Sequence, residues 1–241
     1  MSIYLSIIIP AYNEEKRIGG TLTAISSFLA KKDFPSEIIV IDDGSTDATA
    51  AAVANFQFSI FNFQFLHHEK NLGKGAALKT GILASQGDFV LFADADGSTP
   101  IEELDKLLPY LSKKDFDIAI GSRYIKGANI QIKQPWYRRI LGRLGNLIIQ
   151  LFLLPGITDT QCGFKLFKGD IARKLFSKLT IKRFGFDMEI LYLAKRKGLK
   201  IVETPVTWLD SPRTRLRPIR DAAKTLSELM RIKYNSLTGK Y

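Results

Sequence analysis

The sequence predicts an α/β fold, in which a mostly parallel, Rossmann-like sheet is flanked by helices. Short apolar runs alternate with helical patterns through the first half of the chain, and this βαβα rhythm is typical of parallel strands joined by crossover helices. Of the 241 residues, 46% are hydrophobic and no tract has a biased composition. A chain of this length and composition can form a substantial core. It has no internal repeat and no linker rich in Gly, Pro or Ser, so we expect one domain over residues 1–241.

The first half supplies the expected sheet and its covering helices in alternation. Strands are assigned to short apolar runs that end at Pro, Gly or acidic residues, and helices to apolar residues recurring every three to four positions. The expected strands are Leu5–Ile9, Glu37–Ile41, Ile60–Leu66, Phe89–Ala93 and Ile118–Ile120. The expected helices are Glu14–Ala30, the Ala-rich stretch up to Asn55 with Ser45 or Asp47 as its cap, Gly75–Ser85 and Ile101–Leu111.

The second half has a less regular pattern, with two amphipathic helices and one late strand. Trp136–Leu154 carries Arg138, Arg139 and Arg143 at one end of an otherwise apolar helical pattern. Ile201–Thr207 is expected to be a strand, and Ile219–Tyr234 the last helix. An amphipathic helix either packs on the core or lies in a membrane interface, and the pattern leaves both open for these two.

The net charge of +11 is divided unequally along the chain. Residues 1–120 have a balance of −6, and residues 121–241 have a balance of +17. A basic half can attract nucleic acid, an anionic membrane surface or phosphorylated substrates, and it can also be an ordinary solvated surface. One cysteine excludes an internal disulfide framework, and no apolar run is long enough to span a bilayer.

Three polar clusters directly follow three of the expected strands. Tyr12-Asn13-Glu14 comes after the first strand, Asp42-Asp43 after the second and Asp94-Ala95-Asp96 after the fourth. In parallel α/β sheets, ligands bind outside the carboxyl ends of the strands. The three clusters together therefore indicate a ligand site at that edge.

Asp94 and Asp96 are the candidate metal ligands. Hard divalent cations prefer carboxylate oxygens, and Mg²⁺ commonly shares its ligands between a few carboxylates and substrate phosphates. A metal at this position would neutralise negative charge on a departing diphosphate. Gly97 and Pro100 fit an ordinary solvated turn equally well, so the spacing alone leaves both interpretations open.

Two further motifs are consistent with nucleotide binding. Asp42-Asp43-Gly44-Ser45 could present a carboxylate to a base or a ribose, although helix capping and a tight turn also explain it. Asn71-Leu72-Gly73-Lys74-Gly75 precedes a helix, so its backbone N–H groups and Lys74 could meet phosphate. The chain has neither the Walker pattern nor G-x-G-x-x-G, which leaves a dinucleotide cofactor unsupported.

As a set, these motifs resemble family 2 glycosyltransferases with the GT-A fold. The resemblance rests on Pro10-Ala11-Tyr12-Asn13-Glu14, Asp42-Asp43-Gly44-Ser45, Asn71-Leu72-Gly73-Lys74-Gly75 and Asp94-Ala95-Asp96-Gly97, in this order. Three later blocks, residues 121–124, 159–165 and 186–189, look like the polyprenyl-phosphate branch of the family. They are closest to dolichyl-phosphate β-glucosyltransferases, with dolichyl-phosphate mannose synthases as the nearest competitor.

The resemblance implies a role for each matching position. A nucleotide-diphosphate sugar would be bound by Pro10, Ala11, Tyr12, Glu14, Asp42, Asp43, Lys74, Asp94, Ala95 and Asp96, with Asp94 and Asp96 holding Mg²⁺ or Mn²⁺. The catalytic set would be Asp96, Arg123, Asp159, Gln161, Asp187 and Glu189. Arg123, Arg213 and Arg215 would hold the acceptor phosphate; the loop that includes Arg217 departs from the Ser-Lys form expected in the eukaryotic branch.

The expected reaction is an inverting transfer of glucose from UDP-glucose to a polyprenyl (dolichyl) phosphate. Residues 1–120 would bind the nucleotide sugar, and residues 121–241 would face the acceptor and a membrane surface. A lipid phosphate is already ionised at neutral pH, so it needs positioning cations and no general base. We expect a cytoplasmic protein that is peripheral on the cytoplasmic face of a membrane.

Three alternatives remain. The donor could be GDP-mannose, and the acceptor could be a saccharide or protein hydroxyl, which would require Asp159 or Asp187 as a general base. The chain could also be a non-catalytic basic protein that binds anionic membranes or nucleic acid. That alternative leaves the acidic clusters unexplained, and the sequence has no helix-turn-helix or RNA-binding signature, so we expect no nucleic-acid partner.

Overall fold

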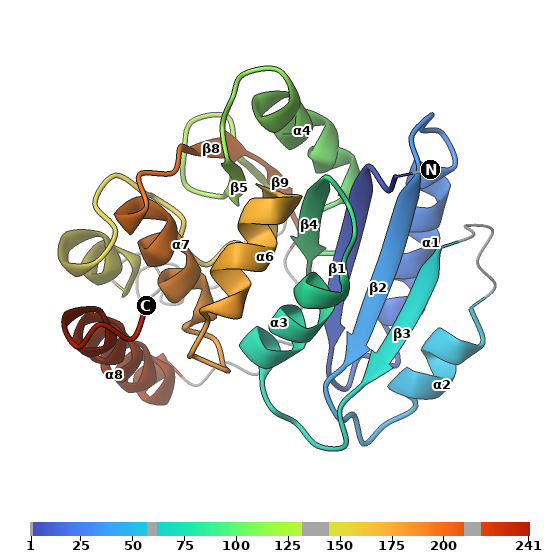
Figure 1. Ribbon diagram of the computed structural model, residues 1–241. Helices are drawn as coiled ribbons and strands as arrows, with labels where there is room; N and C mark the ends of the chain where they lie inside the picture. Colours follow the sequence, from blue (N-terminus) through green and yellow to red (C-terminus); the bar gives the residue numbers. More distant parts are fainter. Residues whose placement is uncertain (1, 57–61, 132–144, 210–217) are drawn as a thin grey trace.

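The computed structural model describes residues 2–56, 62–131, 145–209 and 218–241 (Figure 1). Within these segments, a seven-stranded sheet has the order β3-β2-β1-β4-β7-β5-β8. Its strands are β1 (Leu5–Ala11), β2 (Ser36–Asp42), β3 (Phe63–His67), β4 (Phe89–Ala93), β5 (Ile118–Ser122), β7 (Phe164–Lys168) and β8 (Ile201–Pro205). The predicted mostly parallel sheet is confirmed.

Helices cover both faces of this sheet, as the alternating pattern predicts (Figure 1). One face packs against α1 (Ile18–Leu29), α2 (Thr49–Ala54), the 3₁₀ turn η1 (Ile101–Glu103) and α4 (Leu104–Ser112). The other face packs against α3 (Lys74–Ala84), α6 (Gly169–Ser177), α7 (Phe186–Arg196), the helical residues 145–152 and α8 (Pro218–Leu237). Strand residues alternate between the two cores because successive side chains point to opposite faces.

The strand β7 was missed by the sequence analysis and differs in direction from its neighbours. It lies between β4 and β5 and runs antiparallel to both, whereas the pairs of β1 with β2 and β4 are parallel. Its sequence, Phe164-Lys165-Leu166-Phe167-Lys168, places a lysine inside a short apolar run. Lys165 is fully buried on this strand. A lysine is almost never fully buried unless a partner compensates its charge, and the sequence alone does not identify that partner, so the run was not assigned as a strand.

The late strand expected at residues 201–207 is divided in two. β8 ends at Pro205, and Thr207 and Trp208 form β9, which pairs in parallel with β6 (Asn129–Ile130). The two short strands extend the β5–β8 pair beyond the main sheet, because each follows one member of that pair along the chain. This extension brings Trp208 close to the end of β5, where Arg123 begins the following loop.

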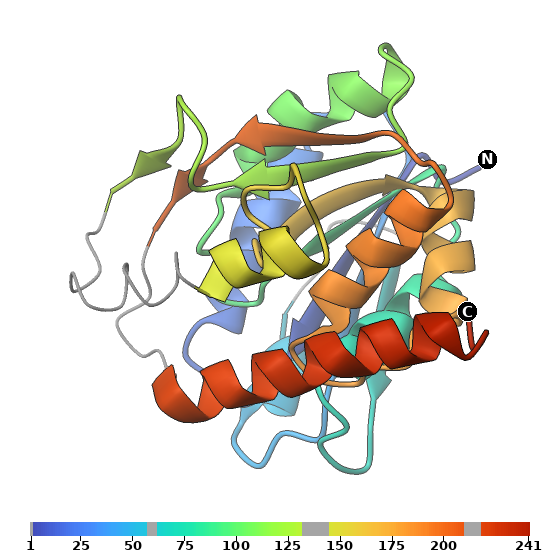
Figure 2. The same ribbon diagram turned by 90° about the vertical axis from the view of Figure 1, so that its left-hand side faces the viewer.

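The two amphipathic helices lie on the same side of the molecule, beside α7 (Figures 1 and 2). The helix expected at 136–154 is present over residues 145–152, and its earlier part lies outside the described residues. The last helix agrees with the prediction and extends to Leu237. None of the helices in the described segments has the length and apolarity needed to cross a bilayer.

Candidate active site at the carboxyl edge of the sheet

The first two polar clusters meet at the edge where β1 and β2 end. Ala11 pairs with Asp42 at the last position of the two parallel strands, and the N–H of Asp43 donates to the Ala11 carbonyl oxygen over 2.8 Å. β4 flanks β1 on its other side and runs in the same direction. The acidic turn after β4 therefore leaves the sheet at this same edge, which agrees with the expected clustering.

The loops that follow β1 and β2 are held together by side-chain hydrogen bonds. The Asn13 N–H donates to Ser45 Oγ over 2.9 Å, and Asn13 Oδ1 accepts from the Thr46 N–H over 2.8 Å. The Glu14 N–H donates to Thr49 Oγ1 over 2.7 Å. Asn13 adopts a φ of 55°, a left-handed conformation that Asn tolerates better than most residues. The two loops, residues 12–14 and 43–49, are joined above the strand ends, and we call them the rim.

The predicted nucleoside-binding residues lie in the rim or at the end of β1, at different depths. Ala11 is buried in β1, Pro10 is half-buried, and the Tyr12 side chain is 39% exposed. Tyr12 thus leaves an aromatic face open toward solvent, where a base could stack. Glu14 is half-buried, and it accepts two hydrogen bonds of 2.6 Å from the Arg17 guanidinium. Burial raises the pKa of Glu14 despite this ion pair.

Asp42 and Asp43 are buried, and their carboxylates hold neighbouring loops. Asp42 accepts a 3.0 Å hydrogen bond from the Ser45 N–H and faces His67 Nδ1 at 3.1 Å. Asp43 accepts from the N–H groups of Leu72 and Gly73 at 3.0 and 2.7 Å. Asp43 therefore fixes the loop that leads to Lys74, a structural role that the sequence analysis did not foresee. Nucleoside binding by either aspartate stays a prediction.

Asp94 and Asp96 lie at the edge between two cationic side chains. Lys74, the first residue of α3, places its Nζ 2.5 Å from Asp94 Oδ1. Arg17 places Nη1 3.5 Å from Asp96 Oδ2. The aspartate side chains keep 34% and 23% of their surface exposed, so solvent or a ligand reaches both. The acidic turn is thus a mixed-charge site that can offer carboxylates to a metal and cations to phosphate.

The backbone around the acidic turn is fixed from two sides. Thr21 Oγ1 donates to the Ala95 carbonyl oxygen over 2.8 Å, which ties the turn to α1. The Asp94 N–H donates to the Gly163 carbonyl oxygen over 3.2 Å. A Cβ on Gly163 would lie 1.9 Å from Asp94 Oδ2, so only glycine leaves room for the carboxylate at this position.

A buried ion pair lies behind the acidic turn. Lys165 on β7 and Asp187 on α7 are both buried; the lysine Nζ pairs with Asp187 Oδ1 and donates to the Cys162 carbonyl oxygen over 2.7 Å. Burial raises the pKa of Asp187 although Lys165 and Lys74 oppose the shift. Burial alone would lower the pKa of Lys74, but Asp94 and Asp187 raise it. These four charged groups form one coupled cluster, which we call the charge cluster: Lys74, Asp94, Lys165 and Asp187.

Arg123 and Asp159 form a second ion pair at the end of β5. Asp159 is buried and accepts hydrogen bonds of 2.9, 2.8 and 2.9 Å from the Arg123 backbone N–H, Nε and Nη2. Burial alone would raise the pKa of Asp159, but Arg123 lowers it below the ordinary value. The guanidinium carbon lies 5.4 Å from the ring centroids of both Tyr124 and Trp208. Asp159 is therefore an ionised anchor for Arg123 and is poorly placed to serve as a general base.

Gln161 and Cys162 lie next to each other in the turn before β7, with opposite burial. Gln161 is exposed. Cys162 is buried, and burial raises the pKa of its thiol to about 12, so the thiol stays protonated. Cys162 has the packing role expected of a small buried side chain.

Glu189, a member of the predicted catalytic set, contacts the segment before α7 and is not part of the charge cluster. It is fully buried on α7, and its carboxylate accepts hydrogen bonds from the backbone N–H groups of Thr180 and Ile181 at 3.1 and 2.7 Å. Asp187, two residues earlier, pairs instead with Lys165. Residues two positions apart on a helix point in different directions, so Asp187 joins the charge cluster while Glu189 holds the segment before α7.

The predicted acceptor-binding arginines Arg213, Arg215 and Arg217 lie outside the described residues. Two residues of the site were not assigned a role by the sequence analysis. Arg17 lies within the first expected helix and carried no motif, whereas Lys165 lies inside a quoted motif as a lone lysine in an apolar run. A lone lysine in an apolar run indicates a buried ion pair, because a lysine is buried in a core only when a partner compensates its charge.

The donor set of the acidic turn fits a divalent cation that shares its ligands with a substrate. In the described part of the chain, no group of three or more His, Cys, Asp or Glu side chains could hold a metal alone. Mg²⁺ sites often consist of one or two carboxylates with substrate phosphates and water. Asp94 and Asp96 supply two partly exposed carboxylates of this kind.

Comparison with known proteins assigns these motifs to a family. The profile of glycosyl transferase family 2 matches residues 6–176. The dolichyl-phosphate beta-glucosyltransferase of Dictyostelium discoideum is 38% identical over 99% of this chain and 76% of its own length. The enzyme with the same name from Saccharomyces cerevisiae is 35% identical over 99% of this chain and 77% of its own length.

Solved structures confirm the fold class. Glucosyl-3-phosphoglycerate synthase from Mycobacterium tuberculosis, in complex with Mn²⁺, UDP and glucosyl-3-phosphoglycerate, has a TM-score of 0.70 at 21% identity, covering 95% of this chain and 80% of its own. Mannosyl-3-phosphoglycerate synthase from Rubrobacter xylanophilus has a TM-score of 0.72 at 17% identity, covering 99% and 76%. These neighbours are GT-A proteins, and the expected GT-A fold is thereby confirmed.

Proposed function

The chain belongs to glycosyl transferase family 2, and from this premise we propose that it transfers glucose from UDP-glucose to a polyprenyl phosphate such as dolichyl phosphate. The relatives from Dictyostelium discoideum, Drosophila melanogaster and Saccharomyces cerevisiae, 35–38% identical to this chain, carry the name dolichyl-phosphate beta-glucosyltransferase. Their names support both the sugar and the acceptor. The observation in this chain that carries the proposal is the acidic turn flanked by Lys74 and Arg17 at the carboxyl edge of the sheet.

The donor would bind across the rim and the acidic turn. Tyr12 offers an aromatic face to the base, and the diphosphate would lie near Lys74 and Arg17. Asp94 and Asp96 would hold Mg²⁺ or Mn²⁺, which would supply stabilisation of the negative charge on the departing UDP. With Asp94 and Asp96 engaged by the metal, the cationic groups of Lys74 and Arg17 would turn from these carboxylates toward the phosphates. Both side chains are positively charged hydrogen-bond donors at the same edge of the sheet.

The acceptor phosphate would attack the anomeric carbon from the side opposite to UDP. The bond from the anomeric carbon to the UDP oxygen breaks while a bond to the acceptor phosphate oxygen forms, so an α-linked donor gives a β-linked product. No proton has to be removed from an ionised phosphate, which agrees with the engagement of Asp159 by Arg123. Arg123 would position the acceptor phosphate, together with Arg213 and Arg215.

A membrane surface would bring the lipid acceptor to this site. Leu147, Ile148, Leu151 and Phe152 of the helical residues 145–152 are all exposed, and so are Leu226, Met230, Tyr234 and Leu237 of α8. Large apolar side chains gathered on one side of a protein mark an interaction surface. Beside the basic balance of residues 121–241, they support an anionic membrane as the partner. We propose peripheral binding at the cytoplasmic face, with residues 121–241 facing the lipid.

The saccharide-hydroxyl alternative has one remaining candidate base. A hydroxyl acceptor needs a base near the attacking oxygen. Asp159 is held ionised by Arg123, whereas burial raises the pKa of Asp187 in the charge cluster. Transfer to a soluble saccharide, abolished by Asp187→Asn and absent with lipid phosphate, would establish this alternative. A GDP-mannose donor would be recognised by tighter binding of that nucleotide sugar than of UDP-glucose.

Titration calorimetry with UDP-glucose and with GDP-mannose, each with Mn²⁺, tests the donor. We expect UDP-glucose to bind, and we expect Asp96→Ala to weaken this binding roughly tenfold or more and to abolish turnover, because one of two metal-binding carboxylates is lost. Far-ultraviolet circular dichroism should show an unchanged fold, since Asp96 is partly exposed. Full activity of Asp96→Ala would remove the metal role from the acidic turn.

A further inference from the structure

Glu189 is a buried carboxylate that accepts hydrogen bonds from several donors. Besides the N–H groups of Thr180 and Ile181, Glu189 Oε1 accepts from Thr180 Oγ1 and from the Tyr241 hydroxyl, both at 2.6 Å. Asn235 Nδ2 on α8 donates to Thr180 Oγ1 over 3.0 Å. One side chain of α7 thus fixes the backbone at residues 180–181 and links it to the end of the chain.

The segment held by Glu189 packs against the beginning of α3. Ala76 N–H donates to the Lys182 carbonyl oxygen over 3.0 Å. A Cβ added to Gly73 would lie 2.5 Å from that same oxygen, and one added to Gly75 would lie 2.6 Å from the Ile181 carbonyl oxygen. Backbone therefore packs against backbone at the first turn of α3, and a shift of residues 181–182 would either break the Ala76–Lys182 hydrogen bond or move this turn.

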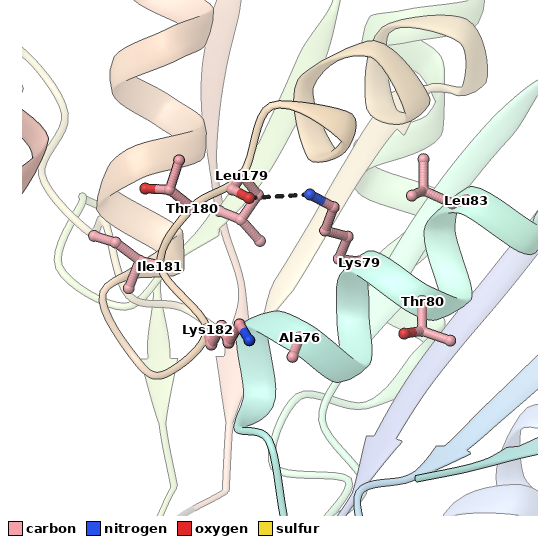
Figure 3. Close-up of a pocket in the computed structure, with 8 residues that line it drawn as sticks. All are labelled: Ala76, Lys79, Thr80, Leu83, Leu179, Thr180, Ile181 and Lys182. Carbon is pink, nitrogen blue, oxygen red and sulfur yellow. Dashed lines mark hydrogen bonds between the residues drawn. The ribbon is translucent and has the colours of Figure 1, made fainter. Parts of the chain in front are cut away.

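The second turn of α3 is attached to the same segment (Figure 3). Lys79 Nζ donates to the carbonyl oxygens of Ser177 and Leu179 over 2.9 and 3.1 Å. A pocket of about 280 Å³ lies between α3 and residues 179–182. The close-up shows Lys79 reaching from α3 toward Leu179, with Ile181 and Lys182 below it. Two turns of α3 are thus docked on residues 177–182.

The docked helix begins with Lys74, whose Nζ contacts Asp94 Oδ1 at 2.5 Å. We propose that Glu189 is a positioning residue for the transfer reaction: it holds residues 180–182 against the first turn of α3 and so keeps Lys74 in place at the acidic turn. This inference rests on the proposed function, since it assumes that Lys74 meets the diphosphate of the donor. It assigns to Glu189 a role without substrate contact, in place of the catalytic role implied by its motif.

Two substitutions of Glu189 distinguish positioning from direct participation. The side-chain oxygen of glutamine can still accept from the N–H groups of Thr180 and Ile181. Its NH₂ group can donate to the hydroxyl oxygens of Thr180 and Tyr241, because a hydroxyl accepts hydrogen bonds as well as donating them. Glutamine has no carboxylate charge and cannot act as a base. Glu189→Gln should therefore retain the function, whereas Glu189→Ala leaves the two N–H groups without their acceptor and frees the segment.

The matched control is Glu37, another buried carboxylate with several donors. Glu37 accepts from Ser6 Oγ at 2.5 Å and from the Gln86 N–H at 2.7 Å, near the start of β2 and far along the strand from the active edge. Glu37→Ala should lower stability as Glu189→Ala does. Because Glu37 holds the chain at Ser6 and at Gln86, beyond the C-terminal end of α3 and at the opposite end of that helix from Lys74, UDP binding should stay at the wild-type level.

The experiment measures UDP binding with Mn²⁺ by calorimetry, together with thermal unfolding and sugar transfer. We expect Glu189→Ala and Lys74→Ala each to weaken UDP binding roughly tenfold. The effects should not add: the double variant should bind UDP about as well as the single variant with the lower affinity, because both changes remove the same contact. Glu189→Gln should bind UDP within about threefold of wild type and retain transfer. Wild-type UDP affinity in folded Glu189→Ala would overturn the proposal, and so would a folded Glu189→Gln that binds UDP but has lost transfer.

Two outcomes separate this inference from the proposed function. If Lys74→Ala leaves UDP binding unchanged, the diphosphate role of Lys74 fails and the positioning role fails with it. If Lys74→Ala weakens binding and Glu189→Ala does not, only the positioning role fails. Should Glu189→Ala not fold, Glu189→Asp replaces it, since its side chain is shorter by one methylene and withdraws the carboxylate from the N–H groups of Thr180 and Ile181; wild-type UDP affinity in that variant overturns the proposal.

Discussion

Gly163 shows how a single backbone position determines the geometry of the acidic turn. Its missing side chain leaves the space that the Asp94 carboxylate occupies, and its carbonyl oxygen accepts the Asp94 N–H. We predict that Gly163→Ala displaces this carboxylate and lowers turnover by roughly a hundredfold, since Asp94 is proposed to hold the metal and misplacing such a group by about 1 Å has effects of this order. Steady-state kinetics with UDP-glucose as donor measures the loss.

Gly20→Ala is the matched control for this substitution. Gly20 lies in α1, and an added Cβ there meets no atom within 4 Å. Alanine should leave turnover unchanged and raise stability by about 0.5–1 kcal/mol, because it reduces the freedom of the unfolded chain in a helical position. If Gly163→Ala turned over at the wild-type rate, the acidic turn would not depend on the present position of Asp94.

The Arg123–Asp159 pair gives a prediction on stability and pH. Arg123→Met leaves a buried carboxylate without its partner, which should cost about 3–5 kcal/mol of unfolding free energy at pH 7. In the wild-type protein, Arg123 lowers the pKa of Asp159 below its ordinary value. The Asp159 carboxylate therefore stabilises the fold at pH values above the ordinary pKa, and this contribution is lost as the pH falls through the lowered pKa. Without Arg123, burial raises the pKa of Asp159, and the penalty develops as the pH rises through the raised value.

The deficit of Arg123→Met relative to wild type should therefore shrink as the pH falls from 7 toward 4. Urea unfolding at several pH values measures this difference. The double variant Arg123→Met, Asp159→Asn removes the titrating carboxylate and should have a deficit that does not change with pH. A deficit of equal size at every pH in the single variant would mean that Asp159 is not the group responsible.

At the level of elements, the regular first half could be predicted from the sequence because each strand is a short apolar run bounded by turn residues. β4, for example, was expected at Phe89–Ala93 and has those bounds. β7 could not be predicted, since its buried Lys165 depends on Asp187, a partner from a helix later in the chain. The motifs located the carboxyl edge correctly because parallel strands end together.

The division of labour among the site residues could not be predicted from motifs alone. Asp187 and Glu189 belong to one motif, yet their carboxylates contact different elements because the helix turns them apart. Asp43 likewise belongs to a predicted binding motif, and its carboxylate holds the loop before α3. A motif identifies the neighbourhood of a residue, whereas its contacts depend on packing between elements distant in sequence.

The helical residues 145–152 provide the prediction for membrane binding. Leu151 and Phe152 are 70% and 63% exposed, so replacing both with Glu should leave the fold intact. The double variant should lose binding to vesicles that contain phosphatidylserine, because each charge opposes insertion of this face among the head groups. Co-sedimentation with vesicles measures the binding.

Leu83→Glu is the control for membrane binding, since Leu83 is 45% exposed and belongs to α3, which is neither of the two amphipathic helices. It should bind vesicles as wild type does. Equal binding by the Leu151→Glu, Phe152→Glu variant would show that this face is not the membrane contact.

For the molecule as a whole, the two halves of the chain divide the charge and the proposed tasks. Residues 1–120 supply the rim and the acidic turn, and residues 121–241, with a balance of +17, supply Arg123 and the two amphipathic helices. The sheet joins both parts, because β7 from the second half lies between β4 of the first half and β5, which spans the boundary between the two. The donor and the acceptor would therefore meet over one continuous sheet.

The most direct test is transfer of radiolabelled glucose from UDP-glucose to dolichyl phosphate in the presence of Mn²⁺. The proposed function predicts a labelled lipid that is extracted into organic solvent, that requires the divalent cation and that is absent with Asp96→Ala. No labelled lipid from either UDP-glucose or GDP-mannose, under conditions in which the chain binds UDP, would contradict it, as would label found only on a soluble saccharide acceptor.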